Sequence, residues 1–372
     1  MIDTPTFYHA LLQKGWDTFF GVPDSLLKDL CAYITEHSLK DQHIITANEG
    51  NAVALATGHY LATGKPAVVY LQNSGLGNTI NPLLSLADPA VYQIPMILMI
   101  GWRGEPGVSD EPQHITQGRL SEALLETLEM PYVLLEEDYE ASLTQLHSLL
   151  EDRHAPVALL IRKNMFTSHN LPNVASPYPL SREAFLEAFI ASIEPEALVV
   201  STTGKASREL FEIREALNQG HAQDFLTVGG MGHTSSIALG LALKTNRPVY
   251  CLDGDGSMLM HLGGVALVAQ NMPNNLTYVV INNGAHESVG AQPTVAFNLK
   301  LPEMFQSFGF ETVVTIEEAS SIKDTLHALK PQLKKAIIVN VNTDSRKDLG
   351  RPTKTPKENK LDLRALLAKD HL

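Results

Sequence analysis

Residues 249–257 read Val-Tyr-Cys-Leu-Asp-Gly-Asp-Gly-Ser, and a second apolar run at 276–281 ends in Asn282-Asn283-Gly284. A strand that runs into Gly-Asp-Gly lets the backbone approach a diphosphate at a helix N-terminus. The Asp255 carboxylate then stays available for a hard cation, and Mg²⁺ prefers a few oxygen ligands together with phosphates. The two segments predict a diphosphate and magnesium site; two turns shaped by Gly and Asn for steric reasons are the alternative.

Short aliphatic runs alternate with helical patterns along the chain, which is typical of parallel α/β layers. The runs are continuously apolar, and this predicts strands that are buried on both faces. The predicted strands are 18–20, 44–47, 67–71, 96–100, 132–135 and 157–161, then 197–201, 225–228, 248–252, 276–281, 311–315 and 336–341, with helices at 50–61, 121–128 and 182–193.

The segment 164–181 contains three prolines and no sustained apolar period, so we place a domain boundary there. The prediction is an α/β protein of two doubly wound parallel-sheet modules, 1–170 and 181–345, followed by a basic segment at 346–372. Residues 345–372 carry eight Lys or Arg residues. That segment is predicted either as a solvated tail with a short amphipathic helix or as a flap over an anionic ligand.

The composition excludes several classes of function. Of the 372 residues, 28 are basic and 41 acidic, and the net charge of −13 argues against a nucleic-acid or anionic-membrane surface. The longest apolar stretch, at 94–102, is interrupted by Pro95 and Gly101, and it is too short to span a bilayer. The two cysteines cannot form a disulfide framework. With no secretory pattern at the start, we expect a cytoplasmic protein.

Gly254-Asp255-Gly256, 25 intervening residues and Asn282-Asn283 resemble the thiamine diphosphate and Mg²⁺ motif of the thiamine-dependent decarboxylases. The resemblance implies that Asp255 and Asn283 are side-chain ligands of the metal and that Ala285 supplies its carbonyl, with Asn282 as the alternative in a shifted register. A glycine-rich segment at 229–236 could donate further bonds to the diphosphate. The expected cofactor contacts are Gly230, Met231, Gly232, His233, Gly254, Asp255, Gly256, Ser257 and Asn283, with a core role as the alternative for Met231.

Glu49 is the second requirement of this chemistry. Thiamine catalysis needs a carboxylic acid beside the aminopyrimidine ring, so that the imino tautomer of this ring can remove the thiazolium C2 proton. Glu49 follows an apolar run and opens a helix rich in small residues, and this resembles the pyrimidine-binding motif of the same superfamily. Stabilisation by the helix dipole alone is the alternative explanation for an acid at that position. The resemblance thus assigns a pyrimidine-type module first and a diphosphate-type module second.

The short layout without a middle domain resembles the phosphonopyruvate decarboxylase family, with the sulfopyruvate decarboxylases as neighbours. The segments that carry this likeness begin at Phe20, Gln72, Trp102, Thr202 and Asn283. The resemblance implies catalytic roles for Glu49, His114 and Asp24, substrate contacts from Ser25, Asn73, Ser74, Arg103, Gln113 and Lys205, and weaker candidates in Arg119, Arg351 and Lys354. For any one of these residues, a surface or capping role is the alternative.

The expected reaction is the thiamine diphosphate- and Mg²⁺-dependent, non-oxidative decarboxylation of 3-phosphonopyruvate to phosphonoacetaldehyde and CO₂, in phosphonate biosynthesis. Sulfopyruvate decarboxylation and thiamine-dependent carboligation are the alternatives. The expected partner is a small anionic 2-oxo acid, and we expect neither a nucleic acid nor a membrane. In this superfamily the cofactor lies between the first module of one subunit and the second module of another, which implies a homodimer or a higher assembly.

Overall fold

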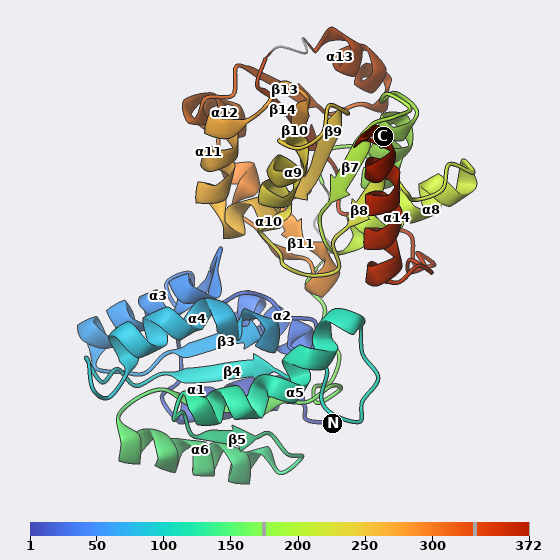
Figure 1. Ribbon diagram of the computed structural model, residues 1–372. Coiled ribbons are helices and arrows are strands. Elements are labelled where there is room, and N and C mark those ends of the chain that lie inside the picture. The colour runs from blue at the N-terminus through green and yellow to red at the C-terminus, as the bar shows by residue number, and fades with distance from the viewer. Residues whose placement is uncertain (173–175, 330–332, 372) are drawn as a thin grey trace. The chain divides into compact units, whose positions relative to one another are not determined.

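A computed structural model describes residues 1–172, 176–329 and 333–371 of the chain (Figure 1). The described chain divides into two compact units, each with its own parallel sheet. Unit 1 contains residues 1–172 together with 286–292, and unit 2 contains residues 176–285 and 293–371. Among the described helices, none has both the length and the apolar character required to cross a bilayer.

Unit 1 contains a six-stranded parallel sheet in the order β2-β1-β3-β4-β6-β5. Its elements are α1 (Thr4–Gln13), β1 (Phe19–Gly21), α2 (Lys28–His37), β2 (His43–Ile45), α3 (Glu49–Thr63), β3 (Val68–Gln72), α4 (Leu76–Pro82), β4 (Ile97–Gly101), α5 (Pro112–Thr127), β5 (Tyr132–Leu134), α6 (Tyr139–Arg153) and β6 (Val157–Ile161).

Unit 2 contains a second six-stranded parallel sheet, in the order β13-β14-β10-β9-β7-β8. Read from β8 and renumbered along the chain, this order is 2-1-3-4-6-5, the same as in unit 1. The elements are α7 (Arg182–Ile190), β7 (Leu198–Ser201), α8 (Lys205–Ala216), β8 (Asp224–Leu226), α9 (Thr234–Ala242), β9 (Val249–Gly254), α10 (Asp255–Met260), α11 (Leu262–Asn271), β10 (Leu276–Asn282), α12 (Leu301–Phe308), β13 (Thr312–Ile316), α13 (Ile322–Ala328), β14 (Lys335–Asn340) and α14 (Pro356–Ala368). The short strands β11 (Ala285–His286) and β12 (Gln292–Pro293) form a separate two-stranded sheet, and its residues 286–292 are assigned to unit 1.

Alternate residues of each central strand point into two separate cores, and this explains the continuous apolar runs. In β3, Val68 and Tyr70 belong to one core with α1, α2 and α6, whereas Val69 and Leu71 belong to the other with α3, α4 and α5. A strand covered on both faces needs an apolar side chain at every position. All twelve predicted strands are confirmed within two residues at each end, but the prediction of burial on both faces is wrong for the edge strand β2, where Ile44 is exposed. The two-residue strands β11 and β12 have no such run, and the sequence did not predict them.

The helix predicted at 121–128 is wrong at its start, because α5 begins nine residues earlier at Pro112. Proline is favoured in the first turn of a helix, where no backbone donor is needed. The Gly118 position lets α5 approach the turn after β4, since a Cβ atom there would lie 1.7 Å from the Gly104 carbonyl oxygen. The Trp102 indole then donates to the Gly118 carbonyl oxygen at 2.8 Å.

The basic C-terminal segment is part of unit 2, and its predicted short helix is confirmed at residues 356–368, although one side of this helix is packed and not solvated. These residues form α14, which lies alongside the edge strand β8 (Figure 1). Leu363 packs into one core of the unit. The buried Asn359 amide accepts from the Leu226 backbone N–H at 3.1 Å and donates to the Asp224 carbonyl oxygen at 2.8 Å. The alternative role as a flap over a ligand stays a prediction.

We expect the Asn359→Ala variant to lower the free energy of unfolding by about 2–4 kcal/mol, because it leaves two buried backbone groups of β8 without partners. Denaturant unfolding followed by circular dichroism measures the change. Lys360→Ala is the matched control, since Lys360 is exposed on the same helix. Equal stability of the two variants would contradict a structural role for the Asn359 amide.

Candidate functional site

In unit 1, four polar side chains follow the carboxyl ends of four neighbouring strands. Glu49 comes after β2, Asp24 after β1, Gln72 ends β3 and Arg103 follows β4. Parallel strands bring their carboxyl ends to one edge of a sheet, and ligands bind there at the point where the strand order reverses. That point lies between β1 and β3, so Asp24 and Gln72 lie on its two sides.

Glu49 is a buried acid at the N-terminus of α3, with only 5% of its surface exposed. Its Oε2 atom accepts from the Asn78 amide at 2.7 Å. A Cβ atom at Gly75 would lie 2.3 Å from Glu49 Oε1, so only glycine leaves room for this carboxyl group. Burial raises the pKa of Glu49, because the charged form loses its hydration. The arrangement holds a carboxyl group that keeps its proton to a higher pH than an exposed glutamate does.

Asp24 is a second buried acid, fully enclosed at the end of β1. Its carboxylate accepts from the Gln72 amide at 2.6 Å and from the Leu26 backbone N–H at 2.9 Å. The predicted substrate contact Ser74 donates to the Gln72 Oε1 atom at 2.7 Å, which extends the chain of bonds toward the surface. Burial raises the pKa of Asp24, although these bonds oppose the shift.

Arg103 is paired with Asp110, which the sequence did not single out. Its Nε atom donates to Asp110 at 2.8 Å, a second guanidinium nitrogen donates to the other carboxylate oxygen, and NH1 donates to Ser25 Oγ at 2.7 Å. Asp110 also accepts from the Gly104 backbone N–H at 2.8 Å. Although burial opposes it, the bonds from Arg103 and Gly104 lower the pKa of Asp110. The guanidinium is thus held in one orientation.

His114 and Gln113 lie in the first turn of α5, and each has a buried polar atom. His114 Nδ1 and Gln113 Oε1 have no hydrogen-bond partner among the described residues. Burial and the nearby Arg103 charge lower the pKa of His114 to about 4, so its ring is neutral at pH 7. Unpaired buried polar atoms are costly and often mark a ligand site. The weaker candidate Arg119 is exposed on the outer side of the same helix.

Asn73 differs from its neighbours because its side-chain amide makes all its described hydrogen bonds to residues of unit 1. One amide hydrogen goes to the Arg103 carbonyl oxygen at 2.8 Å and the other to Ser121 Oγ at 2.9 Å. The Asn73 Oδ1 atom accepts from the Arg103 backbone N–H at 3.2 Å. This side chain therefore fixes the turn that carries Arg103, and its two donors are occupied.

In unit 2, the Gly-Asp-Gly motif joins β9 to the start of α10. Asp255 is buried there, and its carboxylate accepts from the Asn283 backbone N–H and from Thr294 Oγ1. Burial raises the pKa of Asp255 to about 6. The contact between Asp255 and Asn283 brings the two predicted metal ligands together, and their oxygen atoms are of the kind that Mg²⁺ prefers.

Asn282 and Asn283 are alternative candidates for the metal ligand, and they differ in the hydrogen bonds that their side chains make. Asn282 donates to the Asn340 amide oxygen at 3.1 Å, which ties the ends of β10 and β14 together. Asn283 lies beyond the strand, and its Oδ1 atom accepts from the Ala285 backbone N–H at 3.1 Å. Gly284 between them has a φ of +67°, and a Cβ atom there would lie 2.3 Å from the Phe297 ring. This tight turn places Ala285 beside Asn283.

The glycine-rich segment at 230–233 is a turn before α9. Gly230 and Gly232 have φ values of +66° and +88°, a region that favours glycine. The Gly232 backbone N–H donates to Ser257 Oγ at 3.0 Å, which connects this turn to the Gly-Asp-Gly segment. The exposed His233 ring stacks on His261, with ring centroids 4.6 Å apart. Met231 is half-buried in the same turn.

The predicted cations of unit 2 are in contact with polar groups of the same unit. Lys205, at the start of α8, donates to Ser345 Oγ at 2.7 Å. Lys354 pairs with Asp362 on α14. The structure therefore places Lys205 at the carboxyl end of β7 and Lys354 at the start of the C-terminal helix.

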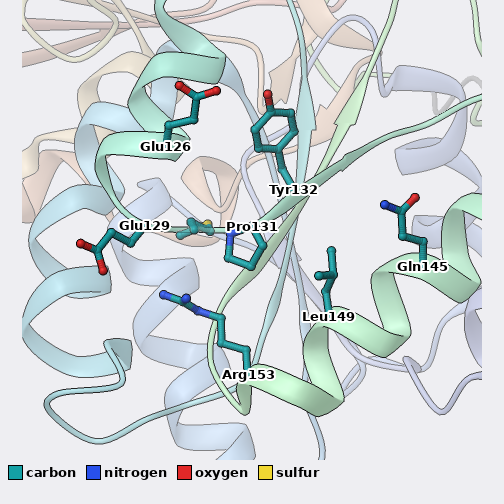
Figure 2. A pocket seen from close by; sticks show the side chains of 8 residues that line it. Glu126, Glu129, Pro131, Tyr132, Gln145, Leu149 and Arg153 are labelled. Atoms are coloured by element: carbon teal, nitrogen blue, oxygen red, sulfur yellow. The ribbon is translucent and has the colours of Figure 1, made fainter.

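A surface hollow of about 530 Å³ lies at another part of unit 1. Figure 2 shows it at the start of β5, where Tyr132, Leu149 and Arg153 line it together with Glu126 and Glu129. This is the amino end of the strand, whereas the predicted site residues follow carboxyl ends. None of the predicted residues lines this hollow.

Three residues of these networks were missed by sequence reasoning: Asp110, Gln72 as a support for Asp24, and Thr294. Their contacts form only in the folded chain, because loops bring Asp110 to Arg103 and Thr294 to Asp255. A usable signal existed for Gln72, because it directly precedes the predicted contacts Asn73 and Ser74.

Comparison with known proteins agrees with this division into two cofactor-binding halves. Residues 5–125 match the family described as "Thiamine pyrophosphate enzyme, N-terminal TPP binding domain", and residues 202–343 match its "C-terminal TPP binding domain". The chain is 34% identical to a phosphonopyruvate decarboxylase of Streptomyces viridochromogenes, over 96% of this chain and 93% of the relative. A phosphonopyruvate decarboxylase of Streptomyces hygroscopicus is also 34% identical, over 96% and 92% of the two chains.

A sulfopyruvate decarboxylase of Methanosarcina acetivorans is 28% identical, over 86% of this chain and 85% of the relative. The identities are higher for the phosphonopyruvate decarboxylases, and those alignments also cover more of both chains. These matches confirm the resemblance seen in the motifs around Glu49 and Asp255. The chain therefore belongs to the phosphonopyruvate decarboxylase family of thiamine pyrophosphate enzymes.

Proposed function

We propose that this chain decarboxylates 3-phosphonopyruvate to phosphonoacetaldehyde and CO₂, as a step of phosphonate biosynthesis. The observation that carries the proposal is the identity of 34% to phosphonopyruvate decarboxylases over 96% of the chain. The bond between the carboxylate carbon and the 2-oxo carbon breaks, CO₂ leaves, and a proton replaces it on the carbonyl carbon. When bound, thiamine diphosphate supplies the sink for the electron pair that this cleavage leaves behind.

The buried acids support a division of roles between the units. Glu49 would hold the aminopyrimidine ring, since a carboxyl group of raised pKa can exchange a proton with a ring nitrogen. Asp255 and Asn283, with the Ala285 carbonyl, would hold Mg²⁺ on the diphosphate. Gly230, Met231, Gly232, His233, Gly254, Gly256 and Ser257 would line the cofactor.

The Arg103 guanidinium of unit 1 supports binding of the doubly charged phosphonate group of the substrate. Arg103 is held by Asp110 and Ser25, so its remaining guanidinium face is oriented before a substrate arrives. Because His114 is neutral, it would contact the substrate carboxylate as a hydrogen-bonding ring and not as a cation. Asp24, Ser74, Gln113 and Lys205 complete the proposed contacts, while Asn73 would position the Arg103 turn.

The proposal also includes the oligomeric state of the protein and its cellular compartment. The cofactor residues are distributed over two separate units, which supports a homodimer or a higher assembly with active sites between subunits. Both thiols, Cys31 and Cys251, are free and buried, which suits a reducing cytoplasm.

For Glu49→Gln, we expect thiamine diphosphate affinity to stay within about threefold while turnover falls by about 100-fold or more, because the amide keeps the shape but cannot exchange the proton. Fluorescence titration gives the affinity, and coupled detection of CO₂ gives the rate. Glu151→Gln, on the exposed side of α6, is the control. Full activity of the Glu49 variant would remove the role assigned to this acid.

For Asp255→Ala, we expect the Mg²⁺-dependent affinity for thiamine diphosphate to be lost, whereas Asp324→Ala, on the surface of α13, keeps it. Protons should compete with the metal at the wild-type carboxylate, because its pKa is raised to about 6. Apparent Mg²⁺ affinity should therefore be constant above pH 7 and fall by up to about tenfold per pH unit below 6. An affinity that does not change between pH 5 and 7 would contradict Asp255 as a ligand.

Phosphonopyruvate should give a higher kcat/KM than sulfopyruvate, the substrate suggested by the 28% identical relative. The phosphonate carries more negative charge near neutral pH, so an oriented guanidinium stabilises it more strongly. Arg103→Lys should reduce this preference, since lysine cannot make the paired bonds to Asp110. Steady-state assays with both acids measure the ratio, and a preference for sulfopyruvate would contradict phosphonopyruvate as the substrate.

A further inference from the structure

Three potential metal ligands meet on the surface of unit 1, apart from the proposed active-site residues. Glu36 and His37 lie in the last turn of α2, and His169 lies in the segment that follows β6. One ligand atom from each side chain lies within 4.8 Å of the other two. The His169 Nε2 and Glu36 Oε2 atoms are 2.8 Å apart. Two of the three side chains are exposed, so an ion can reach them from solvent.

The His37 ring is oriented by its own helix. Its Nδ1 atom is 3.0 Å from the Tyr33 carbonyl oxygen, which can only accept a hydrogen bond. The proton therefore lies on Nδ1, and the lone pair of Nε2 is free to bind a cation. The ring also stacks on Tyr33, with centroids 3.8 Å apart and planes 11° apart. A histidine that donates one ring N–H to a carbonyl group and binds metal with the other nitrogen is the usual arrangement in metal sites.

His169 is held from two sides. The Asp29 carboxylate accepts from the His169 backbone N–H at 3.1 Å, and Glu36 contacts its ring nitrogen. Asp29 and Glu36 both belong to α2, so this helix fixes the backbone and the side chain of His169. The negative end of the helix dipole, at the C-terminal end of α2, also favours a cation beside Glu36 and His37.

We propose that Glu36, His37 and His169 form a Zn²⁺ site with water as the fourth ligand. Two nitrogen ligands and one carboxylate suit Zn²⁺, and neutral imidazole is a poor ligand for Mg²⁺. Bonds of about 2.0–2.1 Å in a tetrahedron place ligand atoms about 3.3 Å apart. The Glu36 and His169 pair would therefore open by roughly half an ångström. Exposed side chains can make such shifts by rotation about their side-chain bonds.

Zinc at this position would connect the end of α2 to the segment that leaves unit 1 after β6. The site is independent of the proposed decarboxylation, because none of its ligands belongs to the Glu49 or Asp255 networks. Binding should therefore raise the thermal stability of the protein without being required for turnover.

The test is isothermal titration of the full-length protein with Zn²⁺ in a buffer that contains excess Mg²⁺, which occupies the oxygen-ligand site. We expect one Zn²⁺ per chain, and at least about tenfold weaker binding in each of His37→Gln, His169→Gln and Glu36→Gln. His9→Gln is the matched control, since His9 is an exposed histidine of the same unit outside the cluster. Circular dichroism without zinc shows that each variant is folded.

A second measurement is the melting temperature with and without Zn²⁺, which should rise for the wild type and for His9→Gln only. If His169 and Glu36 form only an ordinary hydrogen-bonded pair, His37→Gln will bind Zn²⁺ as the wild type does, and the proposal fails. It also fails if the wild type binds no stoichiometric Zn²⁺ under these conditions.

Discussion

Burial of carboxyl groups at the carboxyl ends of parallel strands is the constraint on which both units depend. Asp24, Glu49, Asp253 and Asp255 are each enclosed there, and burial raises the pKa of each. An enclosed acid is tolerated only where donors surround it and where the neighbouring backbone leaves space. The fold meets both conditions with amide and backbone donors and with glycines at the contact points. Such perturbed acids concentrate where chemistry takes place.

The two units share one strand order but present different chemistry at the same edge. In unit 1 the strand ends carry a buried carboxyl group, Glu49, and an oriented guanidinium, Arg103. In unit 2 the strand ends carry the carboxylate oxygens of Asp255 and the turn formed by Gly230 and Gly232. The topology therefore fixes where a ligand can bind, while the residues that follow each strand decide what it is. Two modules of the same architecture can in this way bind different ends of one cofactor.

Local apolar patterns were sufficient to predict the fold, because the central strands, whose residues alternate between two cores, are apolar at most positions. The start of α5 was missed, since its first two turns are polar and only Pro112 indicates them. The motifs around Glu49 and Asp255 were found because they resemble motifs of the thiamine-dependent decarboxylases. Asp110 and Thr294 were missed because their partners are determined by loops that fold back. The packing of α14 was not predicted, because its many charged residues are typical of a solvated segment.

The Asn359 amide has a consequence for the solubility of unit 2. Strand β8 ends the sheet, and the outer backbone groups of an edge strand can pair with a strand from another molecule. The side-chain amide of Asn359 offers one acceptor and one donor to Leu226 and Asp224, as a peptide group of a seventh strand would. A single side chain thus imitates the missing neighbour, and the helix behind it blocks the approach of a foreign strand. The C-terminal helix in this way protects the native protein against aggregation through β8.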